Sequence, residues 1–299
     1  MNWIALSLLS ALLLGFYEVS KKASVDNNAV LPVLLASSLS GLVLLVPVVL
    51  LSRYAPATAA HWDMTLAPIS HAGHLLVFAK AIIVTLSWVL TYFALKHLPI
   101  SLASPVRASA PLFTLMGALL LFRERPSLTQ WLGIFCVLAA YWGFSLIGRK
   151  EGIRFERNRW IWCLFAGTLV GAASGLYDKH LLQSVHIAPM ALQLWFTIYA
   201  CLIQGLIVVL AWWPRHHQTT PFSFRPSIVL VALLLILADA VYFRALSSPG
   251  ALVSIVSTIR RSNVVISFAV GGLAFQEKYR RRKALALLGV LAGIALLVK

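Results

Sequence analysis

The chain has 299 residues, of which 60% are apolar and only 11% are charged, and its mean hydropathy is +0.87. Soluble domains carry about 25% charged residues, so the composition excludes a soluble globular protein and indicates an integral membrane protein. The formal net charge of +16 does not indicate nucleic-acid binding, because the basic residues lie mostly between apolar segments. Their densest clusters, 149–159 and 277–283, fit the lysine and arginine bias of cytoplasmic loops, in contact with anionic lipid.

Apolar segments that can form membrane-spanning helices follow one another along the chain. We expect ten of them, at residues 3–21, 30–51, 75–95, 100–122, 128–147, 160–178, 188–213, 227–246, 250–275 and 283–298. Backbone polar groups in lipid must be satisfied within the segment, so these spans are predicted to be helices. Residues 3–20 lack the basic region and cleavage site of a secretory signal, which favours a retained first helix.

The second half of the sequence repeats part of the first. A shift of 153 residues places 101–139 on 254–292 with eleven of 39 positions identical, including Arg107 with Arg260 and Glu124 with Glu277. We therefore predict two repeats, 1–147 with helices 1–5 and 160–298 with helices 6–10. Because five is odd, the second repeat would be inverted in the membrane, which is typical of secondary transporters.

The end of each fourth helix carries a family resemblance. The segments LLLFRERPSLTQWLGIFCVLAAY (119–141) and GLAFQEKYRRRKALALLGVLAGI (272–294) each run from an apolar stretch through an acidic residue into a helix with small residues. In this pattern the chain resembles an EamA-type member of the drug/metabolite transporter superfamily. The resemblance implies an all-α membrane protein with ten transmembrane helices as two inverted five-helix repeats. Members export amino acids, drugs and other metabolites, and relatives carry nucleotide sugars or phosphorylated sugars.

Ionisable residues within the predicted spans are candidates for a functional site, because a charge in the bilayer normally faces the bundle interior or a wet cavity. Five of them lie well inside their spans: Glu18, Arg107, Asp239, Arg260 and Arg261. Six lie near span ends and are compatible with snorkelling to the headgroups: Lys21, Lys22, Lys80, Asp178, Lys179 and Arg244.

The adjacent arginines of the ninth span are predicted to have different roles. Neighbouring residues on a helix point about 100° apart, so one guanidinium can pair with a buried acid, Asp239 or Glu18, while the other faces a substrate. Arg260 aligns with Arg107 in the repeat, whereas Arg261 aligns with Ala108 and breaks the symmetry. The guanidinium fork suits carboxylate or phosphate. A purely structural role for both arginines stays open.

The segment IRRSNVVIS also resembles the ninth helix of plant phosphorylated-sugar translocators. In that family a lysine–arginine pair grips the substrate's phosphate, and this resemblance implies Arg261 as an anion ligand. The predicted substrate-binding residues are Arg261, Arg260, Arg107, Glu18, Lys22, Trp88, Tyr92, Lys179, Asp239, Tyr242 and Asn263. The aromatic members are equally compatible with interfacial belts.

The sequence is compatible with three functions. The first is a secondary transporter, an exporter, that moves a small polar metabolite of anionic or amino-acid type by alternating access. The second is a proton-coupled multidrug exporter of lipophilic cations, with Glu18 or Asp239 as the coupling carboxylate, although Lys21 and Lys22 beside Glu18 disfavour a cation. The third is a lipid-acting enzyme, for which the loop 52–74 with His61, Asp63, His71 and His74 is the place to look; we expect that the protein is not an enzyme.

The remaining expectations concern partners and orientation. The protein is expected to be a multi-pass protein of the cell inner membrane, a monomer or weak homodimer without cofactor, metal or nucleic acid, whose partners are a small-molecule substrate and membrane lipid. Cys136, Cys163 and Cys201 are isolated, and the spacings Gly167/Gly171/Gly175 and Gly289/Gly293 favour close helix packing within one protomer. The family resemblance implies cytoplasmic termini, whereas the positive-inside rule favours external ones.

Overall fold

The computed structural model describes residues 2–62, 64–107, 127–150, 157–274 and 280–298, together with positions 110, 113, 114 and 117. Within this part of the chain all the regular elements are helices. The first half contains α1 (Trp3–Val25), α2 (Val30–Tyr54), the short α3 (Pro56–His61), α4 (His71–His97), α5 (Ile100–Arg107) and α7 (Leu128–Lys150).

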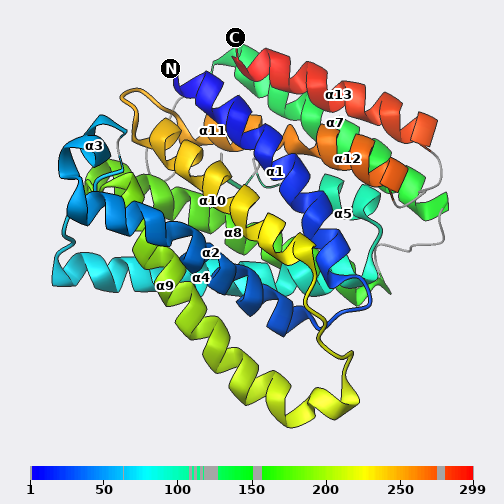
Figure 1. The fold of residues 1–299 in the computed structure, drawn as a ribbon. Coiled ribbons are helices and arrows are strands. Elements are labelled where there is room, and N and C mark those ends of the chain that lie inside the picture. The colour runs from blue at the N-terminus through cyan, green and yellow to red at the C-terminus, as the bar shows by residue number, and fades with distance from the viewer. Residues whose placement is uncertain are drawn as a thin grey trace.

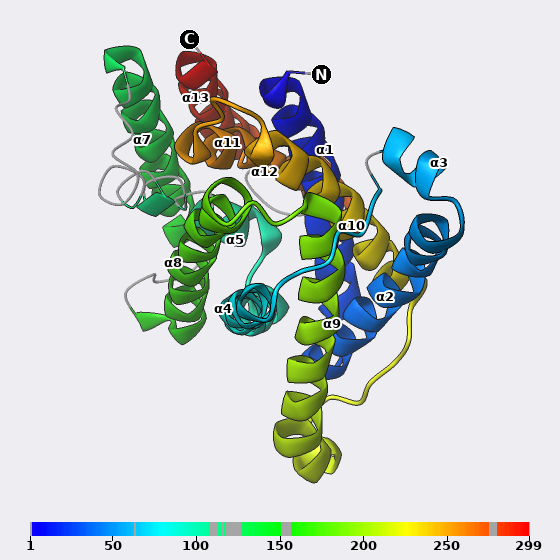
Figure 2. The same ribbon diagram turned by 90° about the vertical axis from the view of Figure 1, so that its left-hand side faces the viewer.

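The second half follows the same order. It contains α8 (Arg159–Lys179) with its extension η2 (His180–Ser184), α9 (Pro189–Ile207) continued by η3 (Val208–Trp212) and η4 (Trp213–Gln218), α10 (Pro226–Ser247), α11 (Val253–Arg260), α12 (Asn263–Ala274) and α13 (Arg280–Val298). The elements form a bundle in which α9 projects beyond its neighbours (Figure 1). Both ends of the chain lie at the same end of the bundle (Figure 2).

Local sequence explains where several helices begin. Asn2, Ser70 and Asn158 each accept a hydrogen bond at their side chain from a backbone N–H of the first helical turn, at 3.3, 3.1 and 2.9 Å. Such caps satisfy donors that have no partner within the helix. Pro189 and Pro226 stand at the start of α9 and α10, where the missing N–H costs nothing.

Seven helices of the described chain are long and apolar enough to cross a membrane: Trp3–Val25, Val30–Tyr54, His71–His97, Arg159–Ser184, Pro189–Gln218, Pro226–Ser247 and Val253–Val270. Two shorter apolar segments, 131–140 and 284–293, lie within α7 and α13. Part of the fourth predicted span, 100–122, lies outside the described residues. The protein is therefore an all-helical, multi-pass membrane protein, and its described residues do not establish a count of ten spans.

The predicted ninth span, 250–275, is not one continuous helix. It breaks at Arg261 and Ser262, between α11 and α12. There the N–H of Arg261 bonds the carbonyl of Thr258 at 3.0 Å and that of Ser262 bonds Ile259 at 3.0 Å. These bonds span three residues rather than four and tighten the chain into a 3₁₀-like turn. The arginine pair thus lies at an interruption of the helix, which alters the face assignments expected for a straight one.

Helices of the first half pack against helices of the second half, and equivalent helices make equivalent contacts. α1 packs along α10, and α8 packs along α4; α7 packs along α13 (Figure 1). Gly167 of α8 approaches α4 so closely that an added Cβ would lie 3.1 Å from the Ser87 carbonyl oxygen. On α13, an added Cβ at Gly289 would lie 2.9 Å from the Ala140 Cβ. Close packing at Gly167 and Gly289 within one chain is confirmed.

Candidate substrate cavity

A cavity of about 150 Å³ lies among α1, α4, α8, α9, α10 and the α11–α12 break. Its wall combines apolar and aromatic side chains with hydroxyls of Ser87, Ser174 and Ser257. Seven charged side chains of the described residues line it: Glu18, Lys80, Arg107, Asp178, Asp239, Arg260 and Arg261. About half of the lining residues are polar or charged, and convergent polar groups in a concave site fix the orientation of a small-molecule ligand.

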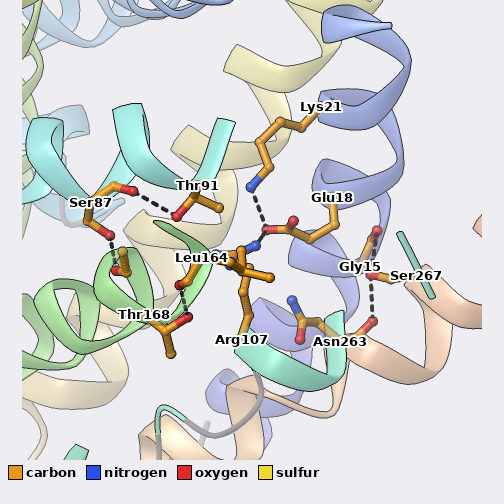
Figure 3. Close-up of polar contacts among 11 residues, drawn as sticks. Gly15, Glu18, Lys21, Ser87, Thr91, Arg107, Leu164, Thr168, Asn263 and Ser267 are labelled. Carbon is orange, nitrogen blue, oxygen red and sulfur yellow. Dashed lines mark hydrogen bonds and ion pairs between the residues drawn. The ribbon is translucent and has the colours of Figure 1, made fainter. Parts of the chain in front are cut away.

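The first charged cluster centres on Glu18 of α1. Its Oε1 accepts a hydrogen bond from Lys21 Nζ at 2.9 Å and is also paired with the guanidinium of Arg107 on α5. Figure 3 shows the two cations reaching the same carboxylate oxygen, Lys21 from above and Arg107 from below. Glu18 and Lys21 are 3% and 1% exposed, so this ion pairing is held away from bulk solvent and is screened little by salt.

The second cluster joins α4 to α8. Lys80 Nζ is ion-paired with Asp178 Oδ1, and both residues are buried. The Lys80 ammonium also lies 4.7 Å from the ring centroid of Phe196 and 5.1 Å from that of Phe243. Aromatic faces attract a cation most strongly where water is excluded, so these two rings help to hold the ammonium inside the bundle.

The third cluster lies at the break of the ninth span. Arg260 donates a hydrogen bond from Nη2 to Asp239 Oδ1 at 2.9 Å, and its guanidinium lies 3.8 Å from the ring centroid of Tyr242. The prediction that one of the two arginines pairs with Asp239 or Glu18 is confirmed for Arg260. Arg261 and Asn263, on either side of the turn, also line the cavity.

Cations exceed carboxylates in this cavity. Among the described lining residues there are four cationic side chains and three carboxylates. Lys21 stands directly behind Glu18 and adds a further basic group. Charges in a site of low dielectric act on a ligand much more strongly than they do in water. The arrangement therefore favours an anionic group over a cationic one.

Eight of the eleven residues predicted to bind substrate line the cavity: Arg261, Arg260, Arg107, Glu18, Trp88, Asp239, Tyr242 and Asn263. Lys22 instead donates hydrogen bonds to the carbonyls of Leu95 and Leu98 at 2.6 and 3.1 Å, where it caps the carboxyl end of α4. Tyr92 is buried behind the wall among α1, α2 and α4, and Lys179 is buried without reaching the cavity.

Lys80 and Asp178 were predicted near span ends, where snorkelling would suffice, and the structure places both of them in the cavity wall. The reason for Lys80 is the length of α4. The Ser70 cap starts this helix at His71 rather than at 75, so Lys80 lies about two and a half turns from the helix start. The cap signal at Ser70 could have revealed this depth.

The histidines of the loop 52–74 do not assemble a catalytic or metal-binding group in the part of the chain described. His61 ends α3, and His74 accepts or donates a 3.0 Å hydrogen bond with the Tyr199 hydroxyl and packs edge-on against Trp195. Asp63 lies outside the described residues. No cluster of three or more histidine, cysteine, aspartate or glutamate side chains suited to a metal ion occurs among the described residues.

Known proteins resemble this chain in sequence and in fold. Residues 1–146 match the EamA-like transporter family. A protein named Uncharacterized transporter sll1319, from Synechocystis sp., is 25% identical over 216 residues, which is 70% of this chain and 62% of that protein; the match thus spans less than two thirds of the relative. A solved structure described simply as "Crystal structure of protein" superposes with a TM-score of 0.66 at 15% identity, covering 98% of this chain and 96% of the other. That likeness shows the fold alone.

The fold and the cavity define a multi-pass α-helical membrane protein with an internal site lined by paired charges. The match to the EamA-like transporter family covers residues 1–146 of the 299. The family resemblance predicted from the fourth-helix ends is thereby confirmed, and a multi-pass location consistent with the inner membrane follows from it.

Proposed function

We propose that this chain is a secondary transporter, an exporter, that moves a small polar metabolite of anionic or amino-acid type by alternating access. The observation that carries the proposal is the cavity between the helices, whose described lining residues include more cations than carboxylates. Two of the three carboxylates, Glu18 and Asp239, are engaged by arginines, which disfavours their use as ligands for lipophilic cations. An anionic group on the substrate would offset the cationic excess.

The ten-helix inverted repeat is part of this proposal. Matching helix contacts support a pseudo-two-fold axis, because the α1–α10 contact has its counterpart in α8–α4. The Cys136 thiol lies 3.4 Å from the Gly289 carbonyl oxygen, and these residues are related by the 153-residue shift. Two residues that a two-fold axis exchanges lie close to each other only near that axis. The contact therefore supports an axis that passes between α7 and α13.

Topology reporters test the inversion. Five spans between the amino terminus and the connection 151–156 would place these two points on opposite sides of the membrane. Reporters of membrane side inserted at these two points should therefore lie on opposite sides of the membrane. A reporter at the carboxyl terminus should lie on the same side as the amino terminus. Equal answers from the amino terminus and the connection would contradict the inverted repeat.

Arg261 is the residue we expect to bind the substrate's anionic group. It lines the cavity at the helix interruption, where it has no equivalent arginine in the first half. Broken helices at mid-membrane commonly form transporter binding sites. A hydrogen bond to a charged group contributes about 1.5–3 kcal/mol, so Arg261→Ala should weaken anion binding roughly tenfold or more.

Thermal stability of the purified protein against a ligand panel tests this role. The panel holds phosphorylated sugars and organic phosphates, amino acids and lipophilic cations. A ligand present at about 100 times its Kd stabilises the folded state by about 2.7 kcal/mol. We expect stabilisation by anionic compounds that is lost in Arg261→Ala and partly kept in Arg261→Lys, which retains the charge but not the planar fork.

Arg282→Ala provides the matched control, since Arg282 is exposed at the start of α13 and does not line the cavity. It should leave ligand stabilisation unchanged. Stabilisation by lipophilic cations alone, equal in wild type and Arg261→Ala, would contradict an anion carrier and favour a multidrug exporter instead.

A further inference from the structure

The cluster at Glu18 has a different stoichiometry from the other ion pairs of the cavity. Asp178 faces Lys80, and Asp239 faces Arg260. Glu18 alone, among the described carboxylates of the cavity, holds two cations on one oxygen, those of Lys21 and Arg107. One positive charge of this cluster therefore has no carboxylate of its own among the described residues.

Lys21 is unusually enclosed for a cation. Its side chain is 1% exposed, and its ammonium lies 4.6 Å from the Tyr17 ring centroid and 5.2 Å from that of Tyr92. The rings belong to α1 and α4, so the ammonium is enclosed on two sides. Burial of a charge is costly unless the charge is paired, and here the paired carboxylate is shared with Arg107.

Three groups of the cluster could in principle change charge, and two of them are constrained. Arg107 cannot lose its proton in a protein. Glu18 is held in its ionised form by two adjacent cations, because opposite charges within about 4–6 Å favour the ionised state of a carboxyl group. A lysine, by contrast, gives up its proton readily when buried. Lys21 is thus the group through which the cluster can shed its excess charge.

We propose that Lys21 is the proton-binding site that couples proton movement to anion occupancy of the cavity. Without an anion, Nζ releases its proton and the cluster becomes a neutral pair of Glu18 and Arg107. An anion that enters beside Arg107 supplies the second negative charge, and Nζ then takes a proton from a hydronium ion of the solvent. The N–H bond that forms replaces the O–H bond that breaks, and a water molecule is left; the reverse transfer returns the proton to water. This inference rests on the proposed transport of an anion and would make each anion travel with a proton.

The surroundings of Lys21 are consistent with this coupling. The charged groups that act on it are Glu18 from its own helix, Arg107 from α5 and Arg261 from the turn between α11 and α12. The neighbouring Asp239 of α10 is engaged by Arg260. Glu18 lines the cavity and touches Lys21, so the carboxylate lies between the ammonium and the space an anion would enter.

The charge state of Lys21 can be followed directly in the full-length protein by NMR of ¹³Cε-labelled lysine. The Lys21 resonance is assigned by its loss in Lys21→Arg, and independently in Lys21→Gln should the first variant fold poorly. We expect the chemical shift of this resonance to change with pH as Nζ gains or loses its proton. Lys22, held by two backbone carbonyls, serves as the internal comparison.

Sulfate then serves as the anion probe, because its charge is constant over the pH range of the titration. Saturating sulfate should raise the midpoint of the Lys21 titration by at least about one pH unit, a tenfold gain in proton affinity. A Lys21 that stays cationic throughout, or one whose titration sulfate leaves unmoved, would overturn the coupling role. Neither result depends on transport. The ligand panel therefore tests the proposed function independently of the coupling role of Lys21.

Discussion

Replacement of Lys80 by methionine is expected to destabilise the protein strongly. Lys80 is the ion-pair partner of Asp178, and both side chains are buried between α4 and α8. Removal of one partner leaves an uncompensated charge in a medium of low dielectric, which costs about 3–5 kcal/mol. Thermal unfolding of the purified protein should show a large drop in the midpoint temperature for Lys80→Met.

The double variant Lys80→Met/Asp178→Leu distinguishes two contributions to this destabilisation: the loss of the ion pair, and the cost of leaving the buried Asp178 carboxylate without a cation. Replacement of a whole buried pair by apolar residues is often neutral, so the double variant should recover most of the lost stability. Its transport activity should nevertheless fall, since both residues line the cavity. If Lys80→Met unfolded at the wild-type temperature, Asp178 would have to reach water, and the snorkelling interpretation of this pair would be correct after all.

Much of the helical frame could be predicted from the sequence because membrane helices need long apolar segments. The described helices follow the predicted order, and the pairing of one arginine of the ninth span with a buried acid, Asp239 or Glu18, was predicted. The cost of an isolated charge in lipid makes such partners necessary. The glycine spacing likewise indicated close packing, which Gly167 and Gly289 show.

Three features could not be predicted because they depend on tertiary contacts. The break at Arg261 occurs without proline or glycine, the residues that most often interrupt a helix. The Lys22 side chain points to the carboxyl end of α4, because backbone carbonyl oxygens there accept hydrogen bonds from its ammonium. The second cation on Glu18 comes from Arg107, which is 89 residues away in the sequence. The residues around Glu18 do not indicate that Arg107 lies next to it.

Gly167→Ala and Gly205→Ala are expected to change stability in opposite directions although the chemical change is the same. At Gly167, the new Cβ would lie 2.8 Å from Thr91 Oγ1, 3.1 Å from the Ser87 carbonyl oxygen and 3.2 Å from Leu90 Cβ. The backbone of α4 cannot turn away as a side chain can, so the helices must separate, at a cost of about 1–3 kcal/mol. The 2.7 Å hydrogen bond from Ser87 Oγ to the Gly167 carbonyl would lengthen as well.

At Gly205 of α9 an added Cβ meets nothing within 4 Å, so the substitution removes backbone freedom from the unfolded chain without a clash. Alanine also favours a helix over glycine by up to about 1 kcal/mol, and Gly205→Ala should therefore be as stable as wild type or more so. The readout is the unfolding temperature of both variants with and without the stabilising ligand. Because α4 and α8 carry Lys80, Asp178 and Ser87 on the cavity wall, separation of these helices should also weaken ligand stabilisation in Gly167→Ala. Equal stability of the two variants would show that α4 and α8 are not in close contact at Gly167, and the wall of the cavity would then have to be built differently.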